Sequence, residues 1–211
     1  MTTTESATDR LLADQGGRRP RADARRNVAR LVAAAREAVV EVGVDVTAHE
    51  IAHRAGVGIG TFYRRVPSRE ALLEAVLADL VTEVAEVART LLSDPDPWHG
   101  FRTFAEAFVR LRVESKGINE ALGRECGLDI DAPVIQLRER AQLLIERAQA
   151  AGALRADLTW QDVTFLLAGL SSVDRTMDIR AEPEQWRRSL HVVLDGLQVT
   201  DSVARMGNLS D

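Results

Sequence analysis

Apolar residues recur at intervals of three and four along most of the chain, which is the spacing of one buried face of an α-helix. The first such stripe starts near residue 22 and ends at Gly43, since glycine tolerates the left-handed backbone that often terminates a helix. Its members are Val28, Leu31, Val32, Ala35, Val39 and Val42. The pattern predicts one helix that ends just before Gly43.

Two short helices are predicted next, joined by a glycine turn. Thr47 can cap the first of them, and its Ile51 and Ala52 face inward. Gly56 ends that helix, and a second short helix is expected over residues 59–65. The small side chain of Ala52 lets the two helices cross closely.

A long amphipathic helix is predicted after Ser68, which is a good N-cap. Its apolar stripe continues towards Pro95, and about 24 residues at ~1.5 Å each would span roughly 36 Å. Further helices are expected at about residues 98–114, 119–127, 133–151, 159–177 and 182–196. No stretch alternates convincingly as a strand does, so the predicted fold class is all-α.

Composition and charge indicate that the two parts of the chain have different tasks. Aromatic residues make up only 4% of the chain, which favours helices over sheets. Residues 16–70 contain eleven arginines and six acidic residues, a net charge of +5, so the remainder carries −10 of the total of −5. A basic N-terminal third on an acidic remainder predicts a polyanion-binding head on a body with another task.

The single cysteine, Cys126, excludes an internal disulfide, which fits a reducing compartment. The N-terminus has no apolar signal core, and no apolar stretch is long enough to cross a bilayer. We therefore expect a cytoplasmic protein without a membrane partner.

The segment from His49 to His53 reads H-E-x-x-H, which is the zinc signature of many metallopeptidases. Two histidines four positions apart on a helix can hold one Zn²⁺, and Glu50 can act as a general base. The extended pattern needs a third histidine at position 59, where this sequence has Ile59. A downstream glutamate could replace it only from the next predicted helix, so a zinc-dependent hydrolase is the alternative and not the main hypothesis.

A helix-turn-helix explains more of the same segment. Gly56 permits the tight turn and Val57 fills the core beneath it. The outward positions of the second helix are Ile59, Thr61, Arg64 and Arg65. Such side chains meet base edges, thymine methyl groups and phosphates in the major groove.

Two segments resemble the N-terminal DNA-binding domain of the tetracycline-repressor (TetR) family: RNVARLVAAAREAVVEVG and VTAHEIAHRAGVGIGTFYRRVPSREALLEAVL. The matching positions are Gly43, Thr47, Ile51, Ala52, Ala55, Gly56, Val57, Gly58, Thr61, Phe62, Tyr63, Arg64, Arg65, Val66, Ser68, Arg69, Glu70 and Leu72. Gly58 stands where the family usually has serine, and Val66 where it usually has phenylalanine.

The resemblance implies four parts: a flexible basic arm (1–20), a three-helix helix-turn-helix domain (21–70), an α-helical effector-binding and dimerisation domain (71–200) reached by the long helix, and a flexible tail (201–211). The DNA-binding residues that it implies are Arg25, Arg26, Thr47, Gly58, Ile59, Gly60, Thr61, Tyr63, Arg64, Arg65 and Arg69, with Arg21 also in the basic arm. Two alternatives stay open: Tyr63 as a core residue and Arg69 as a solvated residue of the first helical turn.

Beyond residue 90 the resemblance is architectural, and it implies that the last two helices pair with those of a second copy. The dimer-interface residues expected are Ala168, Gly169, Ser172, Leu190, Val193, Leu194 and Leu197. The residues expected to line an effector pocket are Phe104, Phe108, Leu111, Leu122, Cys126, Leu144 and Phe165. An intrachain core is the alternative for both sets, and Cys126 is also a candidate redox sensor.

The predicted function is that of a DNA-binding transcriptional regulator, a repressor that binds a palindromic operator as a homodimer and leaves it when a small-molecule effector binds. It is expected not to be an enzyme and to use no cofactor or metal. A regulator that dimerises and binds DNA without an effector is the third hypothesis.

Overall fold

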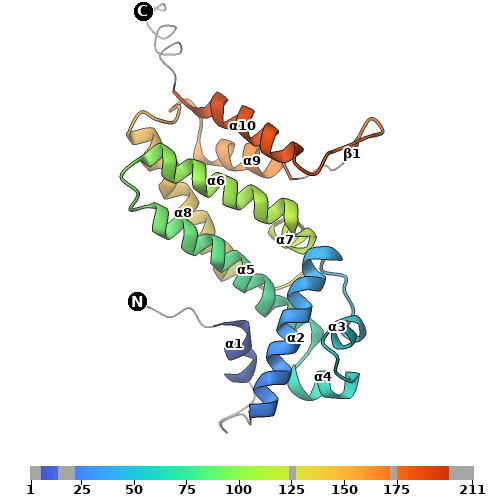
Figure 1. Cartoon of the computed structure of the whole chain (residues 1–211). Coiled ribbons are helices and arrows are strands. Elements are labelled where there is room, and N and C mark those ends of the chain that lie inside the picture. The colour runs from blue at the N-terminus through green and yellow to red at the C-terminus, as the bar shows by residue number, and fades with distance from the viewer. Residues whose placement is uncertain (1–5, 14–21, 124–126, 172–174, 200–211) are drawn as a thin grey trace, which may run out of the picture. The chain divides into compact units, whose positions relative to one another are not determined.

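The computed structural model describes residues 6–13, 22–123, 127–171 and 175–199 (Figure 1). The helices are α1 (Ala7–Ala13), α2 (Ala22–Glu41), α3 (Ala48–Arg54), α4 (Ile59–Arg65), α5 (Arg69–Leu91), α6 (Pro97–Glu114), α7 (Lys116–Leu122), α8 (Asp131–Ala150), α9 (Trp160–Gly169) and α10 (Gln185–Leu197). Two short strands, β1 (Arg175–Thr176) and β2 (Ile179–Arg180), form one antiparallel hairpin. The all-α fold class is confirmed, and no described helix has the length and apolarity needed to span a membrane.

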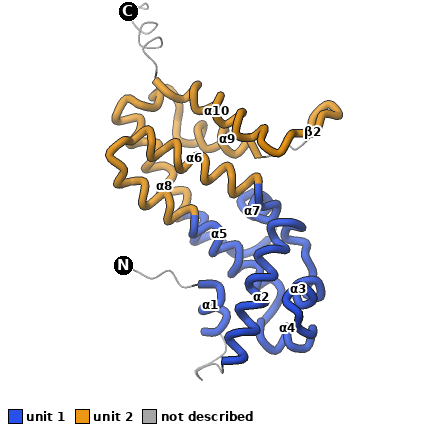
Figure 2. Tube along the Cα trace, in the orientation of Figure 1, with its two compact units in different colours: residues 1–83, 114–135 blue, residues 84–113, 136–211 orange. Residues whose placement is uncertain are grey.

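The chain divides into two compact units (Figure 2). Unit 1 holds residues 1–83 and 114–135, and unit 2 holds residues 84–113 and 136–211. This division differs from the expected boundary at residue 70, because residues 69–83 of α5 and all of α7 belong to unit 1.

Helices α2, α3 and α4 build the helix-turn-helix of unit 1 from local signals in the sequence. The Thr47 side chain accepts a hydrogen bond from the backbone N–H of Glu50 at 3.2 Å, which caps α3. Gly56 has a φ of +62°, in the left-handed region that favours glycine, so it makes the turn possible. Phe62 of α4 is fully buried and Val66 nearly so, which fixes α4 on this core.

Helix α7 packs against the C-terminal end of α2 within unit 1. Gly117 lies so close to α2 that an added Cβ would be 2.5 Å from Cγ1 of Val39. The Glu120 carboxylate accepts a hydrogen bond from the Val44 backbone N–H at 2.9 Å. Helix α7 therefore supports the helix-turn-helix, although it lies about 50 residues beyond it in the sequence.

Helix α1 corrects the expectation of a flexible arm for residues 7–13. Its Leu11 and Leu12 are buried, and the Ala7 backbone N–H donates to the Asp79 carboxylate at 2.8 Å. Arg10 pairs with the same carboxylate and donates to the Ala75 carbonyl at 2.8 Å. These contacts to α5 explain why a largely polar segment is ordered. Residues 1–5 and 14–20 of the arm and the tail at 201–211 lie outside the described residues.

Unit 2 contains α6, α8, α9 and α10 around a core that includes the fully buried Phe101, Phe104, Leu144 and Ile145. Residues 153–155 are tied to the end of α10: the Arg155 N–H donates to the Leu197 carbonyl at 3.0 Å, and the Val199 N–H donates to the Ala153 carbonyl at 3.1 Å. This short pairing holds the segment before α9 against the C-terminal end of the last helix.

The helix expected over residues 159–177 ends earlier, at Gly169. The β1–β2 hairpin follows, with Met177 and Asp178 at φ values of +46° and +62° in its turn. Asp tolerates this conformation, but Met rarely adopts it, and this turn has no Asn-Gly or Asp-Gly pair to signal a hairpin. The prediction that this helix continues to about residue 177 was therefore wrong, because the turn lacks the residues that usually signal a hairpin in a sequence.

Candidate nucleic-acid interface

Glycines at the N-terminal end of α4 leave its surface there open to solvent. A Cβ added to Gly58 or Gly60 would meet no other group within 4 Å, so packing does not require glycine at either position. Ile59 lies between the two glycines and Thr61 follows Gly60, and both are half-buried, with part of each side chain accessible. The missing side chains leave room for another backbone to approach α4 closely.

The basic and hydrogen-bonding side chains of α4 lie on its exposed side. Arg64 is exposed and donates from Nη2 to Oγ1 of Thr61 at 3.1 Å, and Arg65 is half-buried. Tyr63 is 58% exposed and makes an edge contact with Phe62, with ring centroids 5.1 Å apart. Tyr63 is therefore a surface residue, and the alternative of a core tyrosine is excluded.

Arg69 has a structural role that the sequence did not reveal. Its Nε donates to the Val46 carbonyl at 2.6 Å and its Nη2 to the Val44 carbonyl, so it fastens the loop between α2 and α3. Nη1 pairs with Glu70 at 2.8 Å. A hydrogen bond to its own backbone N–H and this guanidinium lower the pKa of the Glu70 carboxyl. The alternative of a simple solvated Arg69 does not hold.

Replacing Arg69 with alanine is expected to lower the free energy of unfolding by about 1–3 kcal/mol, because two backbone carbonyls lose a charged donor. The melting temperature of the purified variant measures this loss. Arg64→Ala is the matched control, since Arg64 is exposed and, among the described residues, its side chain bonds only to Thr61, and it should melt close to the parent. Equal melting of all three proteins would contradict the structural role of Arg69.

Arg25 and Arg26, at the start of α2, are exposed and face carboxylates. Arg25 pairs with Asp9 of α1 at 2.8 Å, and Arg26 pairs with Asp23. Such exposed pairs are weak and can be exchanged for a phosphate at little cost. Arg21 lies outside the described residues.

Two further arginines hold the helix-turn-helix in place and were missed in the sequence. Arg30 donates from α2 to the Gly56 carbonyl at 3.2 Å, which supports the turn. Arg54 pairs with Glu41 at 2.7 Å and with Glu50 at 2.9 Å, and hydrogen bonds to both carboxylates raise its pKa. The sequence could not identify these two arginines, because it does not show which helices face each other.

The H-E-x-x-H segment is part of α3. His49 and His53 are exposed, while the Glu50 carboxylate is engaged by Arg54. Within the described ranges no three His, Cys, Asp or Glu side chains cluster closely enough to hold a metal ion. In this geometry Glu50 acts as an ion-pair partner inside the helix-turn-helix.

The residues expected to line an effector pocket differ in their burial, although the rings of Phe104 and Phe108 stack with centroids 5.9 Å apart. Phe104, Phe108 and Leu144 are buried in unit 2, but Phe165 is 79% exposed and so is no interior residue. Leu111 is half-buried in unit 2, Leu122 is half-buried in unit 1, and Cys126 lies outside the described residues.

The residues expected at a dimer interface divide into two groups. Leu190, Leu194 and Leu197 are buried within their own chain, which corrects the expectation that they face a partner. Ala168 and Val193 are half-buried, Gly169 is exposed, and Ser172 lies outside the described residues. The apolar stripe of α10 thus packs on unit 2 itself.

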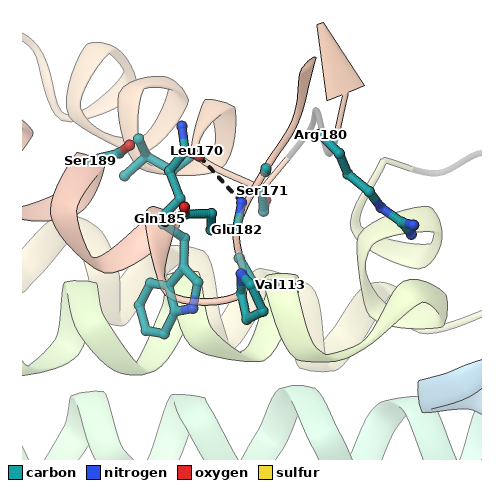
Figure 3. A pocket seen from close by; sticks show the side chains of 10 residues that line it. Val113, Leu170, Ser171, Arg180, Glu182, Gln185 and Ser189 are labelled. Carbon is teal, nitrogen blue, oxygen red and sulfur yellow. Dashed lines mark hydrogen bonds between the residues drawn. The ribbon is translucent and has the colours of Figure 1, made fainter. Parts of the chain in front are cut away.

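Unit 2 has an open cleft of about 580 Å³ beside the hairpin (Figure 3). It is lined by Val113 at the end of α6, by Leu170 and Ser171 after α9, and by side chains between Arg180 and Ser189. In Figure 3, Ser171 and Glu182 lie between Ser189 on one side and Arg180 on the other. Of the residues expected in an effector pocket, none that the structure describes lines this cleft.

Two family profiles match the sequence. The profile described as "Bacterial regulatory proteins, tetR family" matches residues 31–76. The profile described as "Transcriptional regulator SbtR-like, C-terminal domain" matches residues 96–199. No curated protein matches the sequence.

Solved structures of TetR regulators are similar to this chain over most of its length. A TetR transcriptional regulator from Streptomyces coelicolor is 32% identical with a TM-score of 0.60, over 82% of this chain and 98% of its own. A TetR transcription regulatory protein from Mycobacterium vanbaalenii is 33% identical with a TM-score of 0.57, over 84% of this chain and 98% of its own. RolR in complex with resorcinol shares the fold at 24% identity and a TM-score of 0.51, over 90% of this chain and 96% of its own.

Proposed function

Because this chain belongs to the TetR family of DNA-binding transcriptional regulators, we propose that it represses transcription as a homodimer bound to a palindromic operator and that a small-molecule effector releases it. The exposed face of α4 carries the proposal. Its glycines leave room for the DNA backbone, and Thr61 and Arg64 offer donors to base edges. A regulator that acts on the bacterial chromosome works in the cytoplasm.

We propose that Arg25, Arg26, Thr47, Tyr63 and Arg65 contact phosphates. Exposed or half-buried arginines and a tyrosine hydroxyl suit that task, because phosphate contacts need charge and donors but little shape. Arg69 supports the same surface indirectly, since it fixes the loop that ends in Thr47.

The homodimer interface is proposed on the outer sides of α9 and α10. Phe165 and Val192 are 79% and 70% exposed, and Leu166 is 45% exposed. Gly169 and Gly196 lie on the same two helices, and a Cβ on either would meet no other group within 4 Å. Because no side chain fills the space at these two positions, a partner helix can pack closely against them.

Release by an effector needs a path from unit 2 to the DNA-binding helices. Helix α7 can provide this path, because only Ser115 separates it from α6. Its Gly117 packs closely on α2, and its Glu120 binds the backbone just after α2. A ligand that shifts the end of α6 would therefore act on α2, and through it on the separation of the two recognition helices.

Selection of genomic DNA fragments by the purified full-length protein tests this function. We expect the bound fragments to share an inverted repeat whose half-sites are centred one or more helical turns apart, because a twofold dimer presents two identical heads. A protein in which Arg64 and Arg65 are both alanine is the control. Recovery of the same fragments by both proteins, or of fragments without a repeat, would contradict the proposal.

A further inference from the structure

We propose that the cleft of unit 2 binds an organic carboxylate with an apolar body, and that Arg112 and Ser171 receive its carboxylate group. The inference rests on the proposed effector-responsive function, and it specifies the chemical class of the effector and the place where it binds. It follows from an unbalanced positive charge, from the lining of the cleft, and from the position of Arg112 in the chain.

Arg112 is a half-buried cation in neutral surroundings. Its Nε donates to Oγ of Ser171 at 2.9 Å, and its guanidinium carbon lies 5.7 Å from the centre of the Phe108 ring. Within the described ranges no carboxylate pairs with it, and burial lowers its pKa. A guanidinium that has lost part of its water and has gained no counter-charge is a ready receptor for a carboxylate, which it can bind through two parallel hydrogen bonds.

Several other half-buried arginines of this chain have carboxylate partners. Arg140 pairs with Glu86 at 2.8 Å, and Arg36 pairs with Glu83 at 2.6 Å. Arg112 departs from this pattern at a place where its hydrogen-bond partner, Ser171, also lines a cleft. The missing counter-charge and the open space therefore coincide.

The lining of the cleft fits an apolar body attached to a single negative charge. Val113, Leu170 and the buried Trp186 supply apolar walls. Glu182 is the acidic residue of the lining, and its carboxylate already pairs with Arg188 at 2.7 Å, so it leaves the charge of Arg112 uncompensated. A volume of about 580 Å³ is in the range of small-molecule sites.

Arg112 is also close in the chain to the helix that supports the DNA-binding head. Ser115, the residue that caps α7, is three positions further on, and its hydroxyl accepts from the Ile118 N–H at 3.3 Å. A ligand that draws Arg112 towards the cleft would pull on the start of α7. Binding in the cleft is thus suited to change DNA affinity.

The experiment measures binding of carboxylates to the full-length protein by calorimetry without DNA. The probes are benzoate and octanoate, each compared with its neutral amide, and sulfate as an anion without an apolar body. We expect at least one carboxylate to bind about 10-fold or more tightly than its amide and than sulfate, because only the carboxylate offers both a charge-assisted bond and apolar contact. Arg112→Gln should lose that preference.

Arg110→Gln is the matched control, because Arg110 is an exposed arginine of the same helix. If Arg112→Gln does not fold, Ser171→Ala and the carboxylate–amide comparison on the parent protein still decide the matter. Equal binding of carboxylate and amide, binding of sulfate as tightly as carboxylate, or no binding of any probe would overturn the proposal. So would a weaker homodimer in Arg112→Gln, since the counter-charge would then come from a second copy of the chain.

Operator binding, measured with and without the bound carboxylate, separates this inference from the proposed function. A protein that binds its operator but no carboxylate refutes the cleft and leaves the DNA-binding function intact. A protein that binds carboxylate in the cleft without any change in operator affinity keeps the site but refutes its role as the effector site.

Discussion

Replacement of Phe165 by aspartate is expected to dissociate the homodimer and to weaken operator binding by about three orders of magnitude or more. Phe165 is the most exposed aromatic side chain of the proposed interface. A carboxylate at this position would be buried without a partner in the dimer, which costs several kcal/mol. A monomer has one DNA-binding domain and contacts only one half-site, so its affinity for the operator falls towards that of non-specific binding.

Sedimentation at micromolar concentration and operator titration measure the two effects on the same samples. Leu143→Asp is the control, since Leu143 is also an exposed apolar residue of unit 2 but belongs to α8. The control should remain a dimer with the operator affinity of the parent. A dimeric Phe165→Asp protein would show that the interface lies elsewhere.

The elements of the DNA-binding head were predictable because their signals are local. Thr47 and Ser68 cap helices, and both make the expected bonds, to the backbone N–H groups of Glu50 and Ala71. Gly43 and Gly56 both have positive φ values at the ends of helices. Helix α4 has the bounds that periodicity predicted, residues 59–65.

The apolar stripes predicted which residues share a helix face but not what covers that face. In α10 the stripe of Leu190, Leu194 and Leu197 faces its own unit, and the exposed apolar residue is Val192 on the other side. A hydrophobic period is the same for a core and for an interface, so it could not decide between them. Exposure in the folded chain made the distinction.

The sequence could not predict long-range polar contacts either. Nothing in the sequence around Glu120 indicates that its carboxylate binds the Val44 N–H, because the two residues are 76 positions apart. Arg112 illustrates the same limit, since its significance depends on Ser171, 59 positions away. Sequence periodicity assigns helices, whereas the site chemistry depends on which helix ends meet.

Substitution of Arg64 and Arg65, one at a time, is expected to weaken operator binding in two different ways. Arg64 is exposed on α4, and Thr61 is its hydrogen-bond partner among the described residues, so it is available to base edges. Arg64→Ala should cost about 1–3 kcal/mol per half-site and relax sequence preference. Arg65 is half-buried near the end of α4, where a phosphate contact needs no base readout.

Arg65→Ala should therefore weaken binding to operator and to scrambled DNA alike. The slope of log affinity against log salt should flatten by about 0.9 for each phosphate that is no longer neutralised, or roughly 2 for a dimer. Fluorescence anisotropy over a series of salt concentrations measures both quantities, and Arg138→Ala in α8, an exposed arginine outside the head, is the control. Operator affinity that is unchanged in both variants would remove α4 from the DNA interface, whereas a change in preference with Arg65→Ala alone would exchange the two assigned roles.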